Sequence, residues 1–158
     1  MYNNKFHTVR GYQLLQKNKK LLTPAMEDYL EMIYRNSLRE GYLRINKLAE
    51  FLNVKASSAS KMVQKLGEIG LVKYERYGIV LLTDSGKTIG EYLLERHNTV
   101  ERFLRLLNCN GDILVQTELI EHNIDAITVE KLQLLNSFFE CNQEIAEKFR
   151  VFKSDFTN

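Results

Sequence analysis

The apolar residues that follow Thr23-Pro24 recur at helical spacing and predict a first helix ending near Gly41. Threonine can cap a helix start, and proline at the first helical position loses no hydrogen bond that the helix needs. The apolar positions of this helix are Met26, Leu30, Ile33 and Tyr34.

Two shorter helices are predicted next, over residues 45–52 and 56–66, with a left-handed stop at Asn53 between them. The second helix has a clean apolar side formed by Ala59, Met62, Val63 and Leu66. Its remaining side chains are small, polar or basic and are our candidate DNA contacts: Ser57, Ser58, Ser60, Lys61, Gln64 and Lys65. Two short helices with such an exposed hydrogen-bonding face predict a helix-turn-helix.

Two β-prone runs, residues 71–75 and 79–82, are joined through Arg76-Tyr77-Gly78 and predict a hairpin. A hairpin directly behind a helix-turn-helix is the wing of a winged helix, and it favours DNA binding over a mere packing unit. The side chains that we expect near a phosphate backbone at this wing are Lys73, Arg76 and Tyr77.

The second half of the chain has a helical pattern. Thr83 and Asp84 open a long helix through about residue 107, and two more helices are predicted over 112–123 and 128–139. There is no internal repeat or low-complexity linker, so we expect the long helix itself to join the two halves. The predicted fold is mainly α, with a basic flexible extension (1–21), a winged-helix domain with a two-stranded wing (22–92), an all-helical domain (93–142) and a loose tail (143–158).

The length of 158 residues and the hydrophobic content of 44% fit one ordinary domain or two small domains that share a core. No apolar run approaches the roughly 18 residues that a membrane span needs, and the N-terminal residues lack the apolar segment of a secretory signal. We therefore expect a cytoplasmic protein without a membrane partner. Cys109 and Cys141 lie far apart in sequence and are expected to be reduced bystanders.

The charge balance changes along the chain. Residues 1–26 contain five basic residues and no acidic ones, whereas residues 93–158 contain seven basic and eleven acidic ones. A basic front is compatible with a polyanionic partner and an acidic rear with cation binding, although both patterns are also compatible with a solvated surface.

Six side chains from three separated elements are candidate metal ligands, because helical spacing puts neighbours three or four residues apart on one face. They are Asp28, Glu31, His97, Glu118, Glu121 and His122. Taken alone, each cluster is more often a solvated face or a capping pair than a ligand set. If the fold brings them together, the four carboxylates would repel one another without a cation. Oxygen and nitrogen donors without sulfur suit manganese and ferrous iron, and selectivity over zinc or copper would come from geometry.

Three stretches of the chain closely resemble the diphtheria toxin repressor superfamily, specifically its manganese transport regulator branch. They are residues 22–34, residues 56–66, and Arg96-His97 together with residues 118–122. The resemblance covers about residues 21–140, and the order, the spacing and all three ligand groups match together. In this branch the metal ligands fall on the six candidate positions, which implies a site for two cations. The iron-responsive relatives use methionine and cysteine where this chain has Asp28 and Glu118, which favours manganese.

The resemblance also implies a homodimer, whose interface we expect to use the apolar positions Leu132, Leu135, Phe138 and Phe139. Two winged helices in such a dimer face successive major grooves of a pseudo-palindromic operator, with half-sites about 34 Å apart. The implied function is a manganese-responsive repressor of metal-uptake genes with Mn²⁺ as co-repressor, while Fe²⁺, Zn²⁺ or other divalent cations can bind in vitro.

Two other functions compete with this one. A metal-dependent hydrolase could hold two cations with paired carboxylates and histidines, but no nucleophile or dedicated general base is recognisable, so we do not expect an enzyme. A winged-helix regulator that responds to an organic ligand or to oxidation would leave the six candidate ligands without a purpose.

Overall fold

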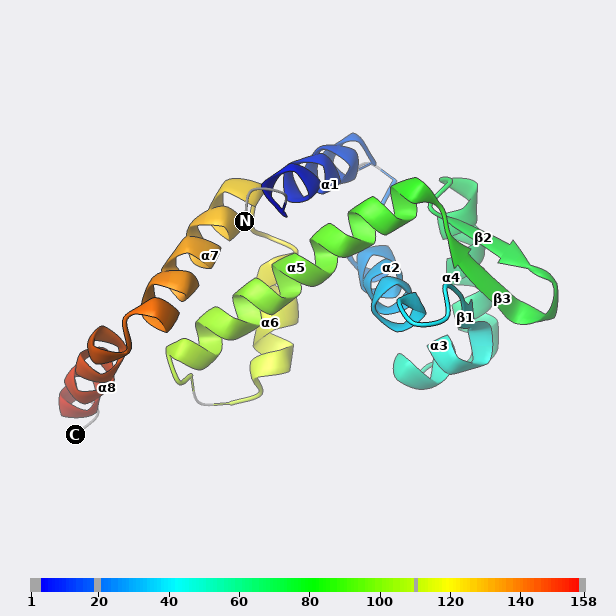
Figure 1. The fold of residues 1–158 in the computed structure, drawn as a ribbon. Coiled ribbons are helices and arrows are strands. Elements are labelled where there is room, and N and C mark those ends of the chain that lie inside the picture. Colours follow the sequence, from blue (N-terminus) through cyan, green and yellow to red (C-terminus); the bar gives the residue numbers. More distant parts are fainter. Residues whose placement is uncertain (1–3, 19–20, 110, 157–158) are drawn as a thin grey trace. The chain divides into compact units, whose positions relative to one another are not determined.

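The computed structural model describes residues 4–18, 21–109 and 111–156, and it is mainly helical, as predicted (Figure 1). The chain divides into two compact units, the first ending at Glu95 and the second beginning at Arg96. This boundary lies inside helix α5 (Asp84–Leu106). The predicted long helix therefore runs from one unit into the other.

Helix α2 (Pro24–Ser37) begins in the first unit where the sequence predicts it. The Oγ1 atom of Thr23 caps the helix by accepting a hydrogen bond from the backbone N–H of Met26 at 3.3 Å. On the inner side of the helix, Leu30 and Ile33 are fully buried. The predicted amphipathic helix is confirmed, and it contributes its apolar side to the core of this unit.

The predicted helix-turn-helix is present as α3 (Ile45–Phe51) and α4 (Ala56–Glu68). Asn53 lies between the two helices with a φ of 51°, the left-handed conformation expected at this turn. The apolar side of α4 is packed into the core through Ala59, Val63 and Leu66. Its other side is exposed, as a recognition helix requires.

Strands β2 (Val72–Glu75) and β3 (Ile79–Leu82) form the predicted hairpin behind α4. A single 3₁₀ turn, Arg76–Gly78, joins them and passes through positive φ. The sequence does not predict a third strand, β1 (Leu43–Arg44), which pairs antiparallel with β3 and gives the order β1-β3-β2. Two residues are too few for strand alternation to be recognised.

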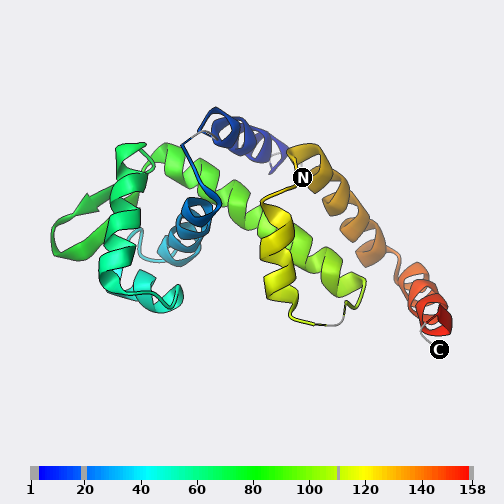
Figure 2. The same cartoon turned by 180° about the vertical axis from the view of Figure 1, so that it is seen from behind.

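Helix α1 (Asn4–Asn18) occupies most of the stretch 1–21 that we expected to be a flexible extension. Both views place this helix (blue) alongside the first half of α5 (green) (Figures 1 and 2). The flexible extension is therefore corrected to a docked helix, while residues 1–3 and 19–20 lie outside the described part of the chain. The composition of this stretch is dominated by basic and polar residues, so its few apolar positions do not predict a docked helix.

The docking of α1 rests on close contacts with α5. Leu15 is buried, and the rings of Tyr12 and Tyr92 meet edge to face with their centroids 5.9 Å apart. A Cβ atom at Gly11 would lie 2.6 Å from the Cβ atom of Tyr92, which is closer than side chains can approach. The approach of the two helices at this point therefore requires glycine.

The second unit continues from α5 through α6 (Ile113–Glu121), α7 (Ala126–Cys141) and α8 (Gln143–Phe156). Asp112 and Asp125 cap α6 and α7, because their side-chain oxygens accept hydrogen bonds from backbone N–H groups of the first turn. The two predicted helices are confirmed with small changes at their ends. Among the described residues, no helix is long and apolar enough to cross a bilayer.

Helix α8 fills the region 143–158 where we expected a loose tail, of which residues 157–158 lie outside the described part of the chain. The ammonium group of Lys153 donates hydrogen bonds to the backbone carbonyls of Leu107 and Asn108. These carbonyls follow the last turn of α5, where a positive charge offsets the helix dipole. This contact gives α8 a fixed place within its unit, which the weak sequence pattern does not reveal.

Candidate metal centre and DNA-binding surface

Two predicted ligands meet in the interior of the second unit. His97 comes from α5 and Glu121 from the last turn of α6, and His97 Nδ1 lies 2.9 Å from Glu121 Oε2. The two residues are 5% and 1% exposed. A buried carboxylate is costly unless it is paired with a hydrogen-bond donor or a cation. The pair therefore brings a nitrogen and an oxygen donor together almost out of contact with solvent.

His122, which directly follows α6, adds a second imidazole to this pair. Its Nε2 atom lies 3.9 Å from Glu121 Oε1, and its Nδ1 atom lies 3.3 Å from Nη2 of Arg96. Three of the six predicted ligands are thus gathered inside the second unit. The fourth predicted ligand of this unit, Glu118, lies on α6 one turn earlier and is exposed.

Glu101 is a further acidic residue near His97, and it is not among the six ligands predicted from the sequence. Its Oε2 atom lies 3.8 Å from Nε2 of His97, and its Oε1 atom accepts a hydrogen bond from Nε of Arg105 at 2.9 Å. The spacing of four residues from His97 on one helix is the signal that identifies it. Glu101 is therefore engaged by Arg105 on one side and faces the imidazole on the other.

The remaining predicted ligands, Asp28 and Glu31, lie one turn apart on α2 in the first unit. Glu31 is buried, and its Oε1 atom accepts a hydrogen bond from Nη2 of Arg35 at 2.5 Å. Asp28 is half-buried. The sequence spacing is thus confirmed as a common helical face, and each unit carries its own group of donors.

The donor atoms of these groups are carboxylate oxygens and imidazole nitrogens, with no thiolate or thioether among the six residues. The buried, closely spaced nitrogen and oxygen donors of His97 and Glu121 fit a divalent cation of intermediate hardness. A cation bound here would also neutralise the buried carboxylate charge of Glu121. The residues present therefore fit a divalent metal.

The candidate DNA-binding face of α4 is solvent-exposed over most of its length. Lys61, Gln64 and Lys65 are exposed, as are the serines at the start of the helix, Ser57 and Ser58. The exception is Ser60, which is half-buried and whose hydroxyl lies 3.0 Å from the hydroxyl of Tyr74 on β2. That hydrogen bond joins α4 to the wing.

The predicted wing residues are all exposed. Lys73 lies on β2, whereas Arg76 and Tyr77 lie in the turn. Tyr77 is 91% exposed and has a φ of 62°, a conformation that few non-glycine residues adopt. A strained, exposed aromatic side chain directly after the basic Arg76 is unusual for a turn that serves packing alone.

The four predicted dimer residues lie on α7 in two different environments. Leu135 and Phe138 are 38% and 46% exposed, whereas Leu132 and Phe139 are half-buried. The exposed pair is therefore available to a partner, and the other pair is at least partly used within the chain.

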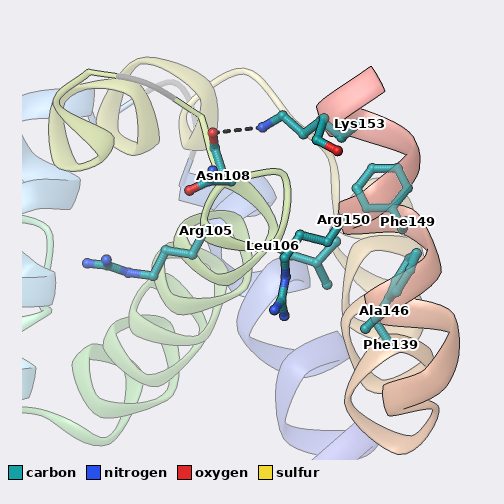
Figure 3. Close-up of a pocket in the computed structure, with 9 residues that line it drawn as sticks. Arg105, Leu106, Asn108, Phe139, Ala146, Phe149, Arg150 and Lys153 are labelled. Atoms are coloured by element: carbon teal, nitrogen blue, oxygen red, sulfur yellow. Dashed lines mark hydrogen bonds between the residues drawn. The ribbon is translucent and has the colours of Figure 1, made fainter. Parts of the chain in front are cut away.

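A cavity of about 450 Å³ lies between the end of α5, α7 and α8 (Figure 3). Phe139 and Phe149 line it with ring centroids 5.6 Å apart, and Lys153 reaches toward the carbonyl of Asn108. None of the six predicted ligands lines this cavity. It is therefore separate from the candidate metal centre.

Two family models match the chain. One is described as the N-terminal DNA-binding domain of iron-dependent repressors and matches residues 21–80. The other is described as the metal-binding and dimerisation domain of the same repressors and matches residues 83–150. The first covers α2 through most of the wing, and the second covers α5 and α6 together with His97, Glu121 and His122.

Curated relatives and solved structures agree with these matches. The HTH-type transcriptional regulator MntR of Lysinibacillus sphaericus is 37% identical over 84% of this chain and 96% of its own length. The MntR of Geobacillus thermodenitrificans is 40% identical over 81% of this chain and 92% of its own length. A structure described as the manganese regulator SloR is 31% identical with a TM-score of 0.55, and the match covers 72% of this chain but only 54% of that chain. The resemblance found in the sequence is confirmed, and the chain belongs to the iron-dependent repressor family of metal-dependent, DNA-binding transcriptional regulators, which are not enzymes.

Proposed function

We propose that this regulator is a cytoplasmic repressor of metal-uptake genes that responds to manganese, with Mn²⁺ as its co-repressor. The observation that carries the proposal is the buried pair of His97 and Glu121, which places oxygen and nitrogen donors inside the segment matched as a metal-binding domain. Donors of this kind, without sulfur, suit Mn²⁺ and Fe²⁺. The description of a solved relative as a manganese regulator favours Mn²⁺.

Six residues form the proposed ligand set, and they hold two cations per subunit: Asp28, Glu31, His97, Glu118, Glu121 and His122. The cations supply positive charge that stabilises the four carboxylates together. Fe²⁺ and Zn²⁺ can use the same donors in vitro, since all three cations accept carboxylate and imidazole ligands. The nitrogen and oxygen donors thereby tie α2 of the DNA-binding unit to the helices of the second unit.

This tie is the proposed link between metal and DNA. Because Asp28 and Glu31 belong to the DNA-binding unit, a cation that they share with His97 and Glu121 selects or stiffens one arrangement of the protein. If DNA favours the same arrangement, each ligand strengthens the binding of the other by equal amounts. A coupling free energy of about 1 to 3 kcal/mol is typical of such systems.

The proposed DNA contacts are the exposed face of α4 and the wing. In a homodimer the two α4 helices enter successive major grooves of a pseudo-palindromic operator, with half-sites about 34 Å apart. Lys61, Gln64 and Lys65 are exposed and able to reach DNA. Arg76 and Tyr77 are exposed in the wing turn, and we expect them to approach the phosphate backbone.

Fluorescence anisotropy on a duplex from the promoter of a manganese-uptake gene tests this function. The protein is titrated first with chelator and then with graded Mn²⁺, Fe²⁺ and Zn²⁺ at constant ionic strength. We expect DNA binding to tighten about 5- to 150-fold with metal, which corresponds to the coupling above. DNA affinity that does not change with any cation would contradict the proposal.

Single substitutions separate the two proposed surfaces. Glu118→Ala or His97→Ala is expected to abolish the response to metal and to leave weak nonspecific DNA binding. Lys61→Ala or Gln64→Ala is expected to weaken DNA binding and to leave metal affinity unchanged. Lys131→Ala, an exposed lysine on α7, is the matched control for the loss of a positive charge.

A further inference from the structure

Arg96 is an arginine buried in the interior of a unit that binds cations. It lies on α5 directly before His97 and is only 3% exposed. Its Nη2 atom lies 3.3 Å from Nδ1 of His122. Guanidinium groups are rarely buried to this extent without a specific role.

The hydrogen bond between Arg96 and His122 fixes the chemistry of the imidazole. A guanidinium group has donors and no acceptor, so Nδ1 of His122 accepts the hydrogen bond with its lone pair. In a neutral imidazole the single ring proton is then on Nε2. In this state Nδ1 of His122 accepts the hydrogen bond from Arg96, and Nε2 carries the ring proton.

A cation bound by His122 is incompatible with this hydrogen bond at either nitrogen. Ligation through Nδ1 uses the same lone pair that accepts the hydrogen bond from Arg96. Ligation through Nε2 moves the ring proton to Nδ1, and an N–H group cannot accept from a guanidinium. Metal loading through His122 therefore requires that Arg96 release the ring.

The positive charge of Arg96 also opposes the binding of a cation. Nε2 of His122 lies 3.9 Å from Oε1 of Glu121, so the positive charge of Arg96 is held one imidazole ring away from the buried carboxylate. A fixed positive charge near a buried carboxylate lowers the cost of burying it. The same charge repels an incoming divalent cation.

We propose that Arg96 is a built-in competitor of the metal, which holds His122 in the metal-free protein and must be displaced when the cation binds. The inference rests on the proposed role of His122 as a ligand. It assigns Arg96 a regulatory effect: the competition raises the cation concentration at which the regulator responds. Arg96 thus sets a threshold and takes no part in ligation.

Isothermal titration calorimetry with Mn²⁺ on the full chain tests this role. Arg96→Met keeps an apolar stem of similar length and removes the competing cation, so we expect Mn²⁺ to bind roughly tenfold tighter, as loss of one charged hydrogen bond implies. Arg96→Lys keeps the charge and is expected to bind closer to the unmodified protein. Arg102→Met removes a positive charge from the exposed side of the same helix and is the matched control, with little expected change.

A helper role for Arg96 predicts the opposite result. If Arg96 oriented His122 for ligation, Arg96→Met would weaken Mn²⁺ binding, and a weaker or unchanged affinity overturns the proposal. Failure of the proposed function is distinguishable, because unmodified protein would then bind no Mn²⁺, or His122→Ala would bind it as tightly as the unmodified protein. Either of those results overturns the ligand set and this inference with it.

Nuclear magnetic resonance on the unmodified protein provides a second measurement that does not depend on how Arg96→Met folds. Nitrogen-15 spectra of the His122 ring are compared in the metal-free protein and with diamagnetic Cd²⁺. We expect a hydrogen-bond coupling from Arg96 to Nδ1 in the metal-free protein and its loss with Cd²⁺. A coupling that persists in the loaded protein overturns the proposal.

Discussion

The two units of the chain differ in what they bury. In the first unit, the core consists of apolar side chains from α1 to the start of α5, and many of them, such as Leu30, Ile33 and Leu48, are completely inaccessible. In the described part of the second unit, the buried apolar side chains are Val100, Leu104 and Val129. The buried polar side chains there are Arg96, His97, Thr99, Thr117, Glu121 and Asn136.

The second unit also exposes many apolar side chains on its surface. Apolar side chains that a single chain leaves exposed include Leu114, Leu119, Ile127, Leu134 and Phe138. A first unit with an apolar core gains most of its stability from the hydrophobic effect. For a second unit with charged residues inside and apolar residues outside, we expect added stability from the proposed cation and from a second copy of the chain.

Removing apolar volume from the first unit is expected to produce the largest effect. Ile33→Ala leaves a cavity at a fully buried position and should lower the free energy of unfolding by about 2 to 5 kcal/mol. Leu38→Ala, at a position 62% exposed, is the control and should change it by less than about 0.5 kcal/mol. Urea unfolding in chelator measures both, and equal losses would contradict a core built in this way.

Metal is expected to stabilise the folded protein through its proposed ligands in both units. With Mn²⁺ at about one hundred times its dissociation constant, linkage predicts a gain of about 2.7 kcal/mol in the free energy of unfolding. Glu121→Gln removes the buried carboxylate charge and should abolish most of that gain. Thermal unfolding with Mn²⁺ and with chelator measures it, and an equal gain in the variant would argue against Glu121 as a ligand.

The exposed apolar side of α7 is expected to matter for assembly and little for folding. Phe138→Glu should raise the dimer dissociation constant by roughly 30-fold, since a loss of about 2 kcal/mol is typical of an important interface residue. Ser137→Glu adds the same charge at the neighbouring exposed position and is the matched control. Sedimentation velocity measures the dimer, and an unchanged constant for Phe138→Glu would place the interface elsewhere.

The docking of α1 extends the apolar core of the first unit. We expect its loss to have a smaller effect on the free energy of unfolding. Gly11→Val introduces a side chain where Tyr92 leaves no room, which should cost about 1 to 3 kcal/mol of stability. Gln13→Val makes the same change of side-chain type at an exposed position of the same helix. Hydrogen exchange of α1 reports the loss of docking, and equal protection in both variants would contradict it.

The smallest effect is expected at the cap of α7. The hydrogen bond from the backbone N–H of Thr128 holds the pKa of the Asp125 carboxyl below its ordinary value of 3.8. Its contribution to stability is therefore present at neutral pH and is lost as the pH falls through that lowered pKa. Asp125→Asn keeps a cap without the charge, so urea unfolding between pH 6 and pH 3 should show a slightly flatter pH dependence.

Much of the first unit could be predicted because its sequence signals are local. Thr23 caps α2, Asn53 marks the turn, and the side-chain spacing of α4 fixes its buried face. Elements that are stabilised by contacts with residues distant in the sequence could not be predicted in this way. Helix α1 is defined by its contact with Tyr92, and β1 by its pairing with β3.

The candidate metal centre could be predicted from its spacing and its resemblance to a family, but its neighbours could not. A search for anionic and imidazole ligands finds Glu121 and His122, and it passes over Arg96, whose burial beside His122 only the three-dimensional structure reveals. A buried arginine beside a metal site has no sequence pattern of its own, because its role depends on which nitrogen of the histidine ring it contacts.

Hydrogen–deuterium exchange with and without Mn²⁺ tests the central claim most directly, which is that one set of ligands from both units closes on the cation. The account predicts that Mn²⁺ slows exchange around Glu121 and His122 and also around Asp28 and Glu31 on α2, while the buried side of α4 is unchanged. In Glu121→Gln both effects should disappear together. Slower exchange confined to the second unit would contradict the claim.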